Sequence, residues 1–242
     1  MTLTIIGSNS AGNCYVLQNE NEALILECGM PFKEAQKALD FNTEKVVGAL
    51  VSHEHGDHFK YVADFQNRGI QVYASKGTWE KKGMKGNELH HGELTKIGNF
   101  KIMPFNVKHD CAEPLGFIID HPETGQILFA TDTYYLPFLF DNITHWLIEC
   151  NYRRDILDAN CPEGSFKQVL RDRTLESHMS YDTCKKALLA NDLSTTRTIT
   201  LIHLSDGNSN AREFKAGIEK ATGKTTYVAS KNMIINYKKT PF

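Results

Sequence analysis

Short apolar runs separated by turn-forming residues dominate the first part of the chain. The runs lie at residues 3–6, 14–17 and 23–26, and Gly, Ser and Asn stand between them. Runs bounded in this way are typical of strands joined by tight turns. Apolar residues then recur three or four positions apart over residues 31–39, and Pro31 suits the first turn of a helix. The pattern predicts three strands followed by one helix.

A continuous apolar run at residues 46–51 is bounded by polar residues, which favours a strand buried on both faces. Further groups of apolar residues, spaced as in strands or in helices, follow along the rest of the chain. They predict strands at residues 70–73, 100–107, 115–120, 126–130, 146–150 and 198–203, and helices at residues 166–170, 181–190 and 211–221. Strands mixed with helices in this way predict an α/β fold.

A cluster of histidines follows the buried strand directly, in the motif His-Glu-His-Gly-Asp-His at residues 53–58. Histidines two positions apart at the end of an extended segment point to the same side, so His53 and His55 can bind one metal ion. Asp57 and His58 are then expected to turn toward a second ion, with Gly56 allowing a tight bend. Imidazole together with carboxylate favours zinc, manganese or iron over calcium or magnesium.

The composition is that of an ordinary folded protein, with 242 residues of which 41% are apolar and 23% charged. A chain of this length buries enough surface to fold without a metal ion or a disulfide. No low-complexity tract, repeat or long Gly/Pro/Ser-rich linker divides it. We therefore expect residues 1–242 to form a single domain.

The formal net charge of −2 gives no global electrostatic reason to expect a nucleic-acid partner. Any such contact must be local. Basic clusters occur at Lys81, Lys82 and Lys85, at Arg171 and Arg173, and at Lys185 and Lys186. Taken alone, each is better interpreted as a solvated helix face.

The cysteines and the amino terminus indicate a location for the protein. The six cysteines include no Cys-x-x-Cys pair and no spacing typical of a disulfide scaffold. The first residues lack the basic segment and long apolar stretch of a signal peptide, and no run reaches the length of a membrane span. We expect a cytoplasmic protein without a membrane partner.

The 53–58 motif resembles the signature of the metallo-β-lactamase superfamily, whose fold is a four-layer αββα sandwich with two metal ions at one edge. The resemblance extends to His109, Asp132 and His203, each of which comes at or just after a predicted strand. It implies that His53, His55 and His109 bind the first ion and that Asp57, His58 and His203 bind the second. Asp132 would bridge the two ions, which are expected to be zinc or manganese.

Four further segments, at residues 7–14, 109–117, 149–151 and 203–205, resemble the YycJ/WalJ branch of this superfamily, whose members are implicated as metal-dependent DNA exonucleases. Residues 177–180 resemble an additional histidine motif of this branch and of the tRNA 3′-processing nucleases. This resemblance implies that His178 stabilises the phosphate or protonates the leaving oxygen. The alternative is that His178 only precedes the helix at residues 181–190, and Ser180 caps that helix in either case.

The sequence departs from this branch at two positions. Glu27 stands where relatives generally have aspartate, and Tyr152 stands where they tend to have histidine, which puts substrate contacts near Tyr152 in doubt. Glu27 and Asp110 are candidates for orienting the metal-binding imidazoles. The remaining histidines match no motif and are interpreted as surface or structural residues: His90, His91, His121 and His145.

These residues together favour a phosphodiester hydrolase that depends on two divalent ions, and specifically a DNA exonuclease. A hydroxide held between the metals would be the nucleophile, with Asp57 and His178 as catalytic residues. One alternative is a phosphodiesterase for cyclic nucleotides or another small phosphodiester. A catalytically inactive nucleic-acid-binding or regulatory protein is less favoured, because all seven ligand positions hold competent side chains. Thioester or lactam hydrolysis leaves His178 without a role.

Overall fold

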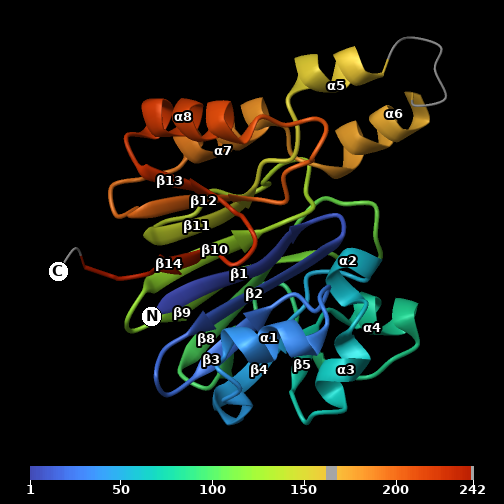
Figure 1. The fold of residues 1–242 in the computed structure, drawn as a ribbon, viewed down its shortest axis with the longest axis vertical. Helices are drawn as coiled ribbons and strands as arrows, with labels where there is room; N and C mark the ends of the chain where they lie inside the picture. The colour runs from blue at the N-terminus through green and yellow to red at the C-terminus, as the bar shows by residue number, and fades with distance from the viewer. Residues whose placement is uncertain (162–167, 241–242) are drawn as a thin grey trace.

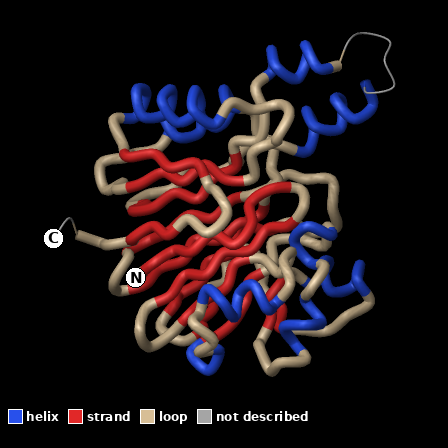
Figure 2. Tube along the Cα trace, in the orientation of Figure 1, coloured by secondary structure: helices blue, strands red, loops and turns tan. Residues whose placement is uncertain are grey.

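Two seven-stranded β-sheets packed face to face form the centre of the molecule (Figures 1 and 2). The computed structural model describes residues 1–161 and 168–240. In the first sheet the strand order is β14-β1-β2-β3-β4-β5-β6, and in the second it is β13-β12-β11-β10-β9-β8-β7. The strands of the first sheet are β1 (Thr2–Asn9), β2 (Gly12–Gln18), β3 (Ala23–Leu26), β4 (Val46–Leu50), β5 (Val72–Ala74), β6 (Asn87–Glu88) and β14 (Ile234–Asn236). Those of the second are β7 (Thr95–Ile97), β8 (Phe100–Asn106), β9 (Leu115–His121), β10 (Gly125–Ala130), β11 (Ile143–Glu149), β12 (Thr198–Ile202) and β13 (Thr225–Val228).

Helices cover the outer faces of both sheets (Figure 1). The first sheet is covered by α1 (Phe32–Ala38), α3 (Val62–Gln66) and α4 (Lys76–Lys82), and the short helix α2 (Gly56–Phe59) lies at its edge. The second sheet is covered by α7 (Tyr181–Ala190) and α8 (Ala211–Thr222). Two helices, α5 (Arg154–Asn160) and α6 (Gln168–Ser177), stand beyond the sheets at one end, and a 3-10 turn occupies Thr43–Lys45.

Three apolar layers hold this arrangement together. Leu3, Tyr15, Phe117 and Phe129 belong to the layer between the sheets. A second layer joins the first sheet to its helices through residues such as Phe32, and a third joins the second sheet to α7 and α8. Because each sheet buries both faces, its central strands are continuously apolar rather than alternating. The layers form the expected four-layer αββα sandwich.

The observed elements agree with most of the expected strands. The predicted helices at residues 31–39, 181–190 and 211–221 are also present, with small changes at their ends. Of the predicted helix at residues 166–170, positions 166 and 167 lie outside the described residues, and α6 occupies the rest. The short elements α2, α3, α4, α5, β6, β7, β13 and β14 were not predicted. Among the described residues, no helix combines the length and apolarity needed to cross a membrane.

Candidate metal centre

The seven side chains that the sequence suggests as metal ligands lie together at one edge of the sandwich. Strands β10, β11 and β12 pair in parallel, so their carboxyl ends meet there. Asp132 comes two residues after β10, and His203 follows β12 directly. In the same sheet β8 leads to His109, and in the facing sheet β4 leads to residues 53–58. The two sheets therefore contribute to one site.

Three residues at this edge adopt a backbone conformation that side chains other than glycine usually avoid. Glu27, Asp132 and His203 have positive φ angles of 67°, 45° and 55°. Each such residue costs about 1–3 kcal/mol, and such residues cluster at functional sites. All three come just after a strand, where the turn directs the side chain into the shared site.

Gly29, rather than Gly56, is the glycine that the local packing requires. A Cβ added to Gly29 would lie 1.6 Å from the carbonyl oxygen of Asp57, whereas a Cβ on Gly56 would meet nothing within 4 Å. Gly56 begins α2 and does not have a positive φ. The expectation that Gly56 permits a tight bend is therefore wrong. The close approach of α2 to the segment after β3 depends on Gly29.

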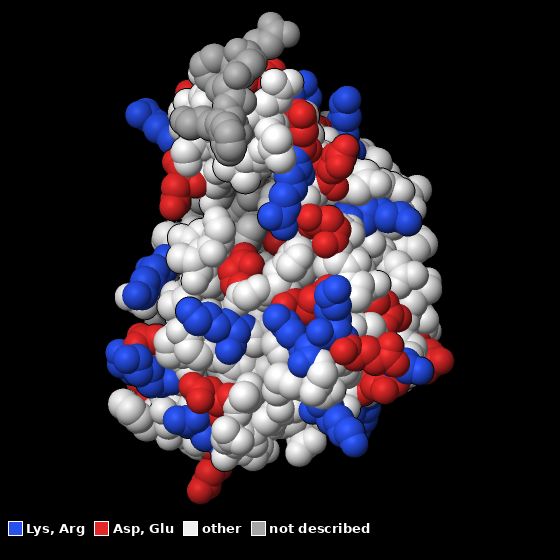
Figure 3. Space-filling view, turned by 90° about the vertical axis from the view of Figure 1, so that its right-hand side faces the viewer, with Lys and Arg blue, Asp and Glu red and all other residues white. Residues whose placement is uncertain are grey.

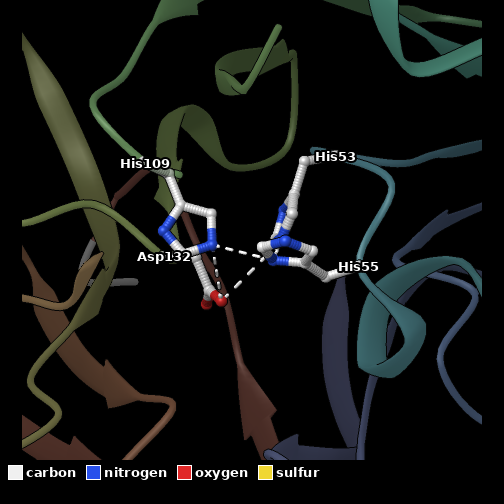
Figure 4. A group of neighbouring side chains, drawn as sticks. All are labelled: His53, His55, His109 and Asp132. Carbon is white, nitrogen blue, oxygen red and sulfur yellow. Dashed lines mark hydrogen bonds and ion pairs between the residues drawn. The ribbon is translucent and has the colours of Figure 1, made fainter. Parts of the chain in front are cut away.

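The first donor group consists of His53, His55, His109 and Asp132 (Figure 4). The Nδ1 atom of His55 lies 3.1 Å from Nε2 of His53 and 3.0 Å from Nε2 of His109. The Oδ2 atom of Asp132 lies 3.7 Å from the same nitrogen of His53 and 3.6 Å from that of His109. Three ring nitrogens and one carboxylate oxygen thus face one point.

The chemistry of this group fits a bound cation better than a hydrogen-bond network. A single ring nitrogen of His55 faces two others, and one proton can satisfy only one of these pairs. A tetrahedral ion at about 2.0–2.1 Å from each ligand would separate the ligand atoms by roughly 3.3–3.4 Å. The observed separations of 3.0–3.7 Å fall on either side of that value.

The outer nitrogen of His109 has a partner that fixes its tautomer. Nδ1 of His109 donates to the carbonyl oxygen of Ser177 at 2.9 Å, which leaves the lone pair of Nε2 facing the first donor group. Asp110, expected from the sequence to orient an imidazole, lies instead 3.4 Å from Nε2 of His109 and accepts from Nε of Arg173 at 3.0 Å. Ser177 therefore has the orienting role that the sequence suggested for Asp110.

The second donor group consists of Asp57, His58, Asp132 and His203, so Asp132 belongs to both groups. Oδ2 of Asp57 lies 3.3 Å from Nε2 of His58 and 3.3 Å from Nε2 of His203. Oδ2 of Asp132 lies 3.4 Å from Nε2 of His58, and its Oδ1 lies 3.4 Å from Nδ1 of His203. The carboxylate of Asp132 thus lies between the two groups, in the position expected of a bridging ligand.

Glu27 and Asn13 support this second group from outside. Oε2 of Glu27 lies 3.4 Å from Nδ1 of His58, an ion-pair distance that turns the other ring nitrogen toward the site. Glu27 thus contacts the imidazole that it was expected to orient. Nδ2 of Asn13 lies 3.1 Å from Nε2 of His58 and donates to Oδ2 of Asp57 at 3.3 Å.

The concentration of charge perturbs the pKa values of these groups. Burial alone would raise the pKa of the Asp57 carboxyl, but hydrogen bonds from His203 and His58 hold it well below its usual range. Burial would lower the pKa of His203, but the Asp132 carboxylate beside it raises that pKa to about 10. Without an ion, the carboxylates therefore favour a proton on His203, whereas burial lowers the pKa values of His53 and His109 in the first group and leaves their ring nitrogens free for a cation.

His178 lies beside the second group rather than at a helix end facing away from it. Its Nδ1 is 2.6 Å from Oε1 of Glu149, and its ring stacks on that of His203 with centroids 5.3 Å apart. Burial would lower the pKa of His178, but the Glu149 carboxylate raises it above its ordinary value. Ser180 caps α7 by accepting a hydrogen bond from the amide of Thr183, as expected.

Glu149 is the residue whose role the sequence did not reveal. Its side chain is fully buried, and Oε1 also lies 3.4 Å from Nδ1 of His203. Its other oxygen, Oε2, accepts from the backbone amides of Thr133 and Met179. The signal in the sequence was an acidic residue at the end of an apolar strand. A carboxylate buried there requires hydrogen-bond or charge partners, which indicates a role in the site.

A cleft of about 500 Å³ opens over both donor groups and is called the catalytic cleft below. His55, Asp57, Asp132, His178 and His203 lie along it. On the side away from the sheets, α5 and α6 contribute residues to its wall: Leu157, Leu170, Arg171, Arg173 and Thr174. His178 and the shared carboxylate of Asp132 therefore face the same cleft.

The other histidines and Tyr152 lie outside the donor groups. His121 is buried and lies 3.1 Å from Glu22, and His145 is buried against Tyr237. His91 stacks on Phe138. Tyr152 is buried and its backbone pairs with Ser180. These positions agree with structural or surface roles.

Comparison with known proteins finds one matching family and several relatives along most of the chain. A family model described as "Beta-lactamase superfamily domain" matches residues 27–204. The Exodeoxyribonuclease WalJ of Streptococcus pneumoniae serotype 2 (strain D39 / NCTC 7466) is 26% identical over 226 residues, covering 85% of this chain and 82% of that protein. The Exodeoxyribonuclease YycJ of Bacillus anthracis is 25% identical over 224 residues, covering 85% of this chain and 83% of that protein.

Solved structures agree on the fold. The metallo-beta-lactamase fold protein YhfI from Bacillus subtilis superposes with a TM-score of 0.74 at 17% identity, covering 97% of this chain and 98% of that chain. At that identity the likeness concerns the fold alone. It confirms the four-layer sandwich expected from the sequence.

Proposed function

The chain belongs to the metallo-β-lactamase superfamily and is a metal-dependent hydrolase, and on that basis we propose that it is a DNA exonuclease with a dinuclear centre. The proposal takes residues 1–242 as one domain. It assigns one ion to His53, His55 and His109, the other to Asp57, His58 and His203, and Asp132 to both. Zinc or manganese is the expected metal, because imidazole and carboxylate ligands suit both.

The donor set supports two ions rather than one. Each group offers four ligand atoms within 4.8 Å of one another, and the groups share Asp132. When bound, two divalent ions would lower the pKa of water so that hydroxide serves as the nucleophile near neutral pH, and they would neutralise charge on the phosphate oxygens. Asp57 is held in one orientation for this purpose, because Asn13, His58 and His203 all contact its Oδ2.

One observation carries the assignment to phosphodiesters: His178 is held by Glu149 in the same cleft as the two donor groups. Because Glu149 accepts from Nδ1, the Nε2 atom remains available to a substrate. Cleavage of a phosphodiester requires a group that stabilises the phosphate or protonates the departing oxygen. A positioned imidazole beside the centre is suited to that task.

The relatives support DNA as the substrate. Two proteins that match most of this chain are named exodeoxyribonucleases. We also propose a cytoplasmic location, because all six cysteines are free in the structure.

A substrate panel tests the proposed function. Protein reconstituted with zinc or with manganese is incubated with end-labelled single-stranded DNA, double-stranded DNA, RNA, cyclic nucleotides and covalently closed circular DNA. We expect nucleotides to be released from linear DNA and the closed circle to survive. Degradation of the closed circle would contradict an exonuclease. Hydrolysis of cyclic nucleotides alone would favour the small-phosphodiester alternative, and an inert protein that binds DNA with every metal would favour a regulatory role.

A further inference from the structure

A second cleft lies beside the metal centre and shares a wall with the catalytic cleft. It encloses about 610 Å³ and has His55, Gly56 and His109 in common with the catalytic cleft. Its other residues are Glu54, two lysines of α4 and three residues of the loop after His109. A chain-like substrate bound at the metal centre can therefore continue into this second cleft, whereas a small molecule would end within the first.

Two exposed lysines of α4 form one wall of the second cleft. Neither Lys81 nor Lys82 has a carboxylate within ion-pairing distance among the residues that the structure describes. The ammonium group of Lys82 lies 5.2 Å from the centre of the Phe59 ring, and Phe59 belongs to α2, the helix that carries Asp57 and His58. Figure 3 looks onto this side of the molecule, where Lys and Arg side chains gather across the middle among acidic ones.

The wall is held firmly in place. Ser75 caps α4 by accepting from the amide of Thr78, and its hydroxyl donates to the carbonyl oxygen of Glu113 at 2.7 Å. Trp79 packs edge-on against Phe59 with ring centroids 5.7 Å apart. These contacts join α4 both to α2 and to the loop on the opposite side of the cleft, so the lysines have a defined position relative to the metal centre.

The acidic residues of the second cleft leave the lysine charges available. Asp110 is paired with Arg173 at 3.0 Å. Glu54 is buried, and its Oε1 accepts from the amide of Ala112 at 2.8 Å, while its Oε2 has no hydrogen-bond partner among the described residues. The carboxylate of Glu54 is buried, and that of Asp110 is paired with Arg173. The two ammonium groups are therefore the exposed, unpaired charges that an incoming anion meets.

We propose that Lys81 and Lys82 bind a backbone phosphate of the DNA strand beyond the phosphate at the metal centre. This inference rests on the proposed function and adds a binding subsite to it. Unpaired ammonium groups on a fixed helix are suited to phosphate oxygens, and such contacts contribute most of the affinity for nucleic acid. A protein with a net charge of −2 requires local cations of this kind.

The test compares two lysine pairs. Lys81→Ala/Lys82→Ala removes the proposed contacts, Lys81→Arg/Lys82→Arg retains the charge, and Lys185→Ala/Lys186→Ala is a matched control on α7, away from both clefts. Binding of a fluorescein-labelled single-stranded oligonucleotide is measured by anisotropy over a range of salt concentrations, without and with manganese. Hydrolysis of bis(4-nitrophenyl) phosphate is measured in parallel, because this small diester does not reach the second cleft.

We expect the Kd of the Lys81/Lys82 alanine variant for the oligonucleotide to rise about tenfold and its log–log salt slope to fall by about 0.7, the value for one neutralised phosphate of a single strand. The arginine variant and the control should resemble the wild type, and turnover of the small diester should be unchanged. Equal affinity in the alanine variant and the control overturns the inference, even if DNA is hydrolysed. Lysine-dependent DNA binding without hydrolysis supports the subsite and contradicts the exonuclease. A wild type that neither binds nor cuts DNA overturns both.

Discussion

Oε1 of Glu149 lies 2.6 Å from Nδ1 of His178, and the same oxygen lies 3.4 Å from Nδ1 of His203. One buried carboxylate thus orients both the proposed acid and a proposed metal ligand. The backbone amides of Thr133 and Met179 donate to its other oxygen and fix the orientation of the carboxylate. This arrangement joins His178 to the second donor group.

Replacement of Glu149 tests that connection. We expect Glu149→Gln to lower kcat about 10- to 100-fold and to weaken binding of one of the two ions, because the amide has one acceptor oxygen and cannot accept both from the imidazoles and from the backbone amides of Thr133 and Met179. Metal titration and steady-state kinetics measure the two effects. Glu149→Asp keeps the charge and should recover part of the ion affinity. If kcat fell while affinity for both ions stayed at the wild-type value, the orientation of His203 by Glu149 would be refuted.

Replacement of His178 tests the assignment to phosphodiesters. His178→Ala should leave the metal content unchanged and lower kcat on DNA by about 10²- to 10⁴-fold, the usual span for a positioned acid or base. A nitrophenyl phosphodiester should lose less, since a good leaving group needs little protonation. The exposed His90 provides a control, and His90→Ala should have no effect. Equal losses on both substrates would point to phosphate binding, and no loss would reduce His178 to a structural residue.

Removal of the shared or second-site carboxylate tests the dinuclear centre. Asp132→Ala and Asp57→Ala should each lower turnover by at least about 10³-fold, because both contribute to the proposed two-ion arrangement. Elemental analysis should find two ions per wild-type chain and fewer in Asp132→Ala. The circular dichroism spectrum should be retained, since the core does not depend on the ions. Near-normal turnover in either variant would rule out the proposed mechanism.

A buried histidine far from the site predicts a loss of stability in acid. His145 lies between Tyr237, on which it stacks at 4.0 Å, and the hydroxyl of Thr198 at 2.8 Å. Burial lowers its pKa to about 4, so between about pH 6.5 and about pH 4 the unfolded chain binds a proton that the folded chain excludes. The stability that this histidine contributes is complete above that range and is lost as the pH falls through it, by about 3 kcal/mol.

Urea unfolding across this pH range measures the effect. His145→Gln should show a smaller decrease in the free energy of unfolding between about pH 7 and about pH 4.5 than the wild type, whatever its stability at neutral pH. His90→Gln, at an exposed position, should follow the wild type. Parallel curves for the wild type and His145→Gln would show that this histidine is not a source of the acid sensitivity.

The sequence by itself determined the central strands and the set of candidate ligands. The 53–58 motif is contiguous, and His109, Asp132 and His203 come at or just after apolar runs, so local patterns were sufficient to find them. The structure brings these side chains into two groups that share Asp132, and their role as ligands stays a prediction. Helices α2 and α4 were not predicted because each carries a single large apolar residue, Phe59 or Trp79, which is too few to show a period.

Only the tertiary structure decided what surrounds the ligands. Asn13 meets Asp57 across 44 positions of sequence, Glu149 meets His178 across 29, and Ser177, rather than the adjacent Asp110, orients His109. The second cleft likewise depends on how α4 packs against α2. A local pattern reports which face of an element is apolar, but it does not report which distant backbone approaches that element. Gly29 illustrates the difference, since a side chain is excluded there by the backbones of Asp57 and Asn13, which are distant in sequence.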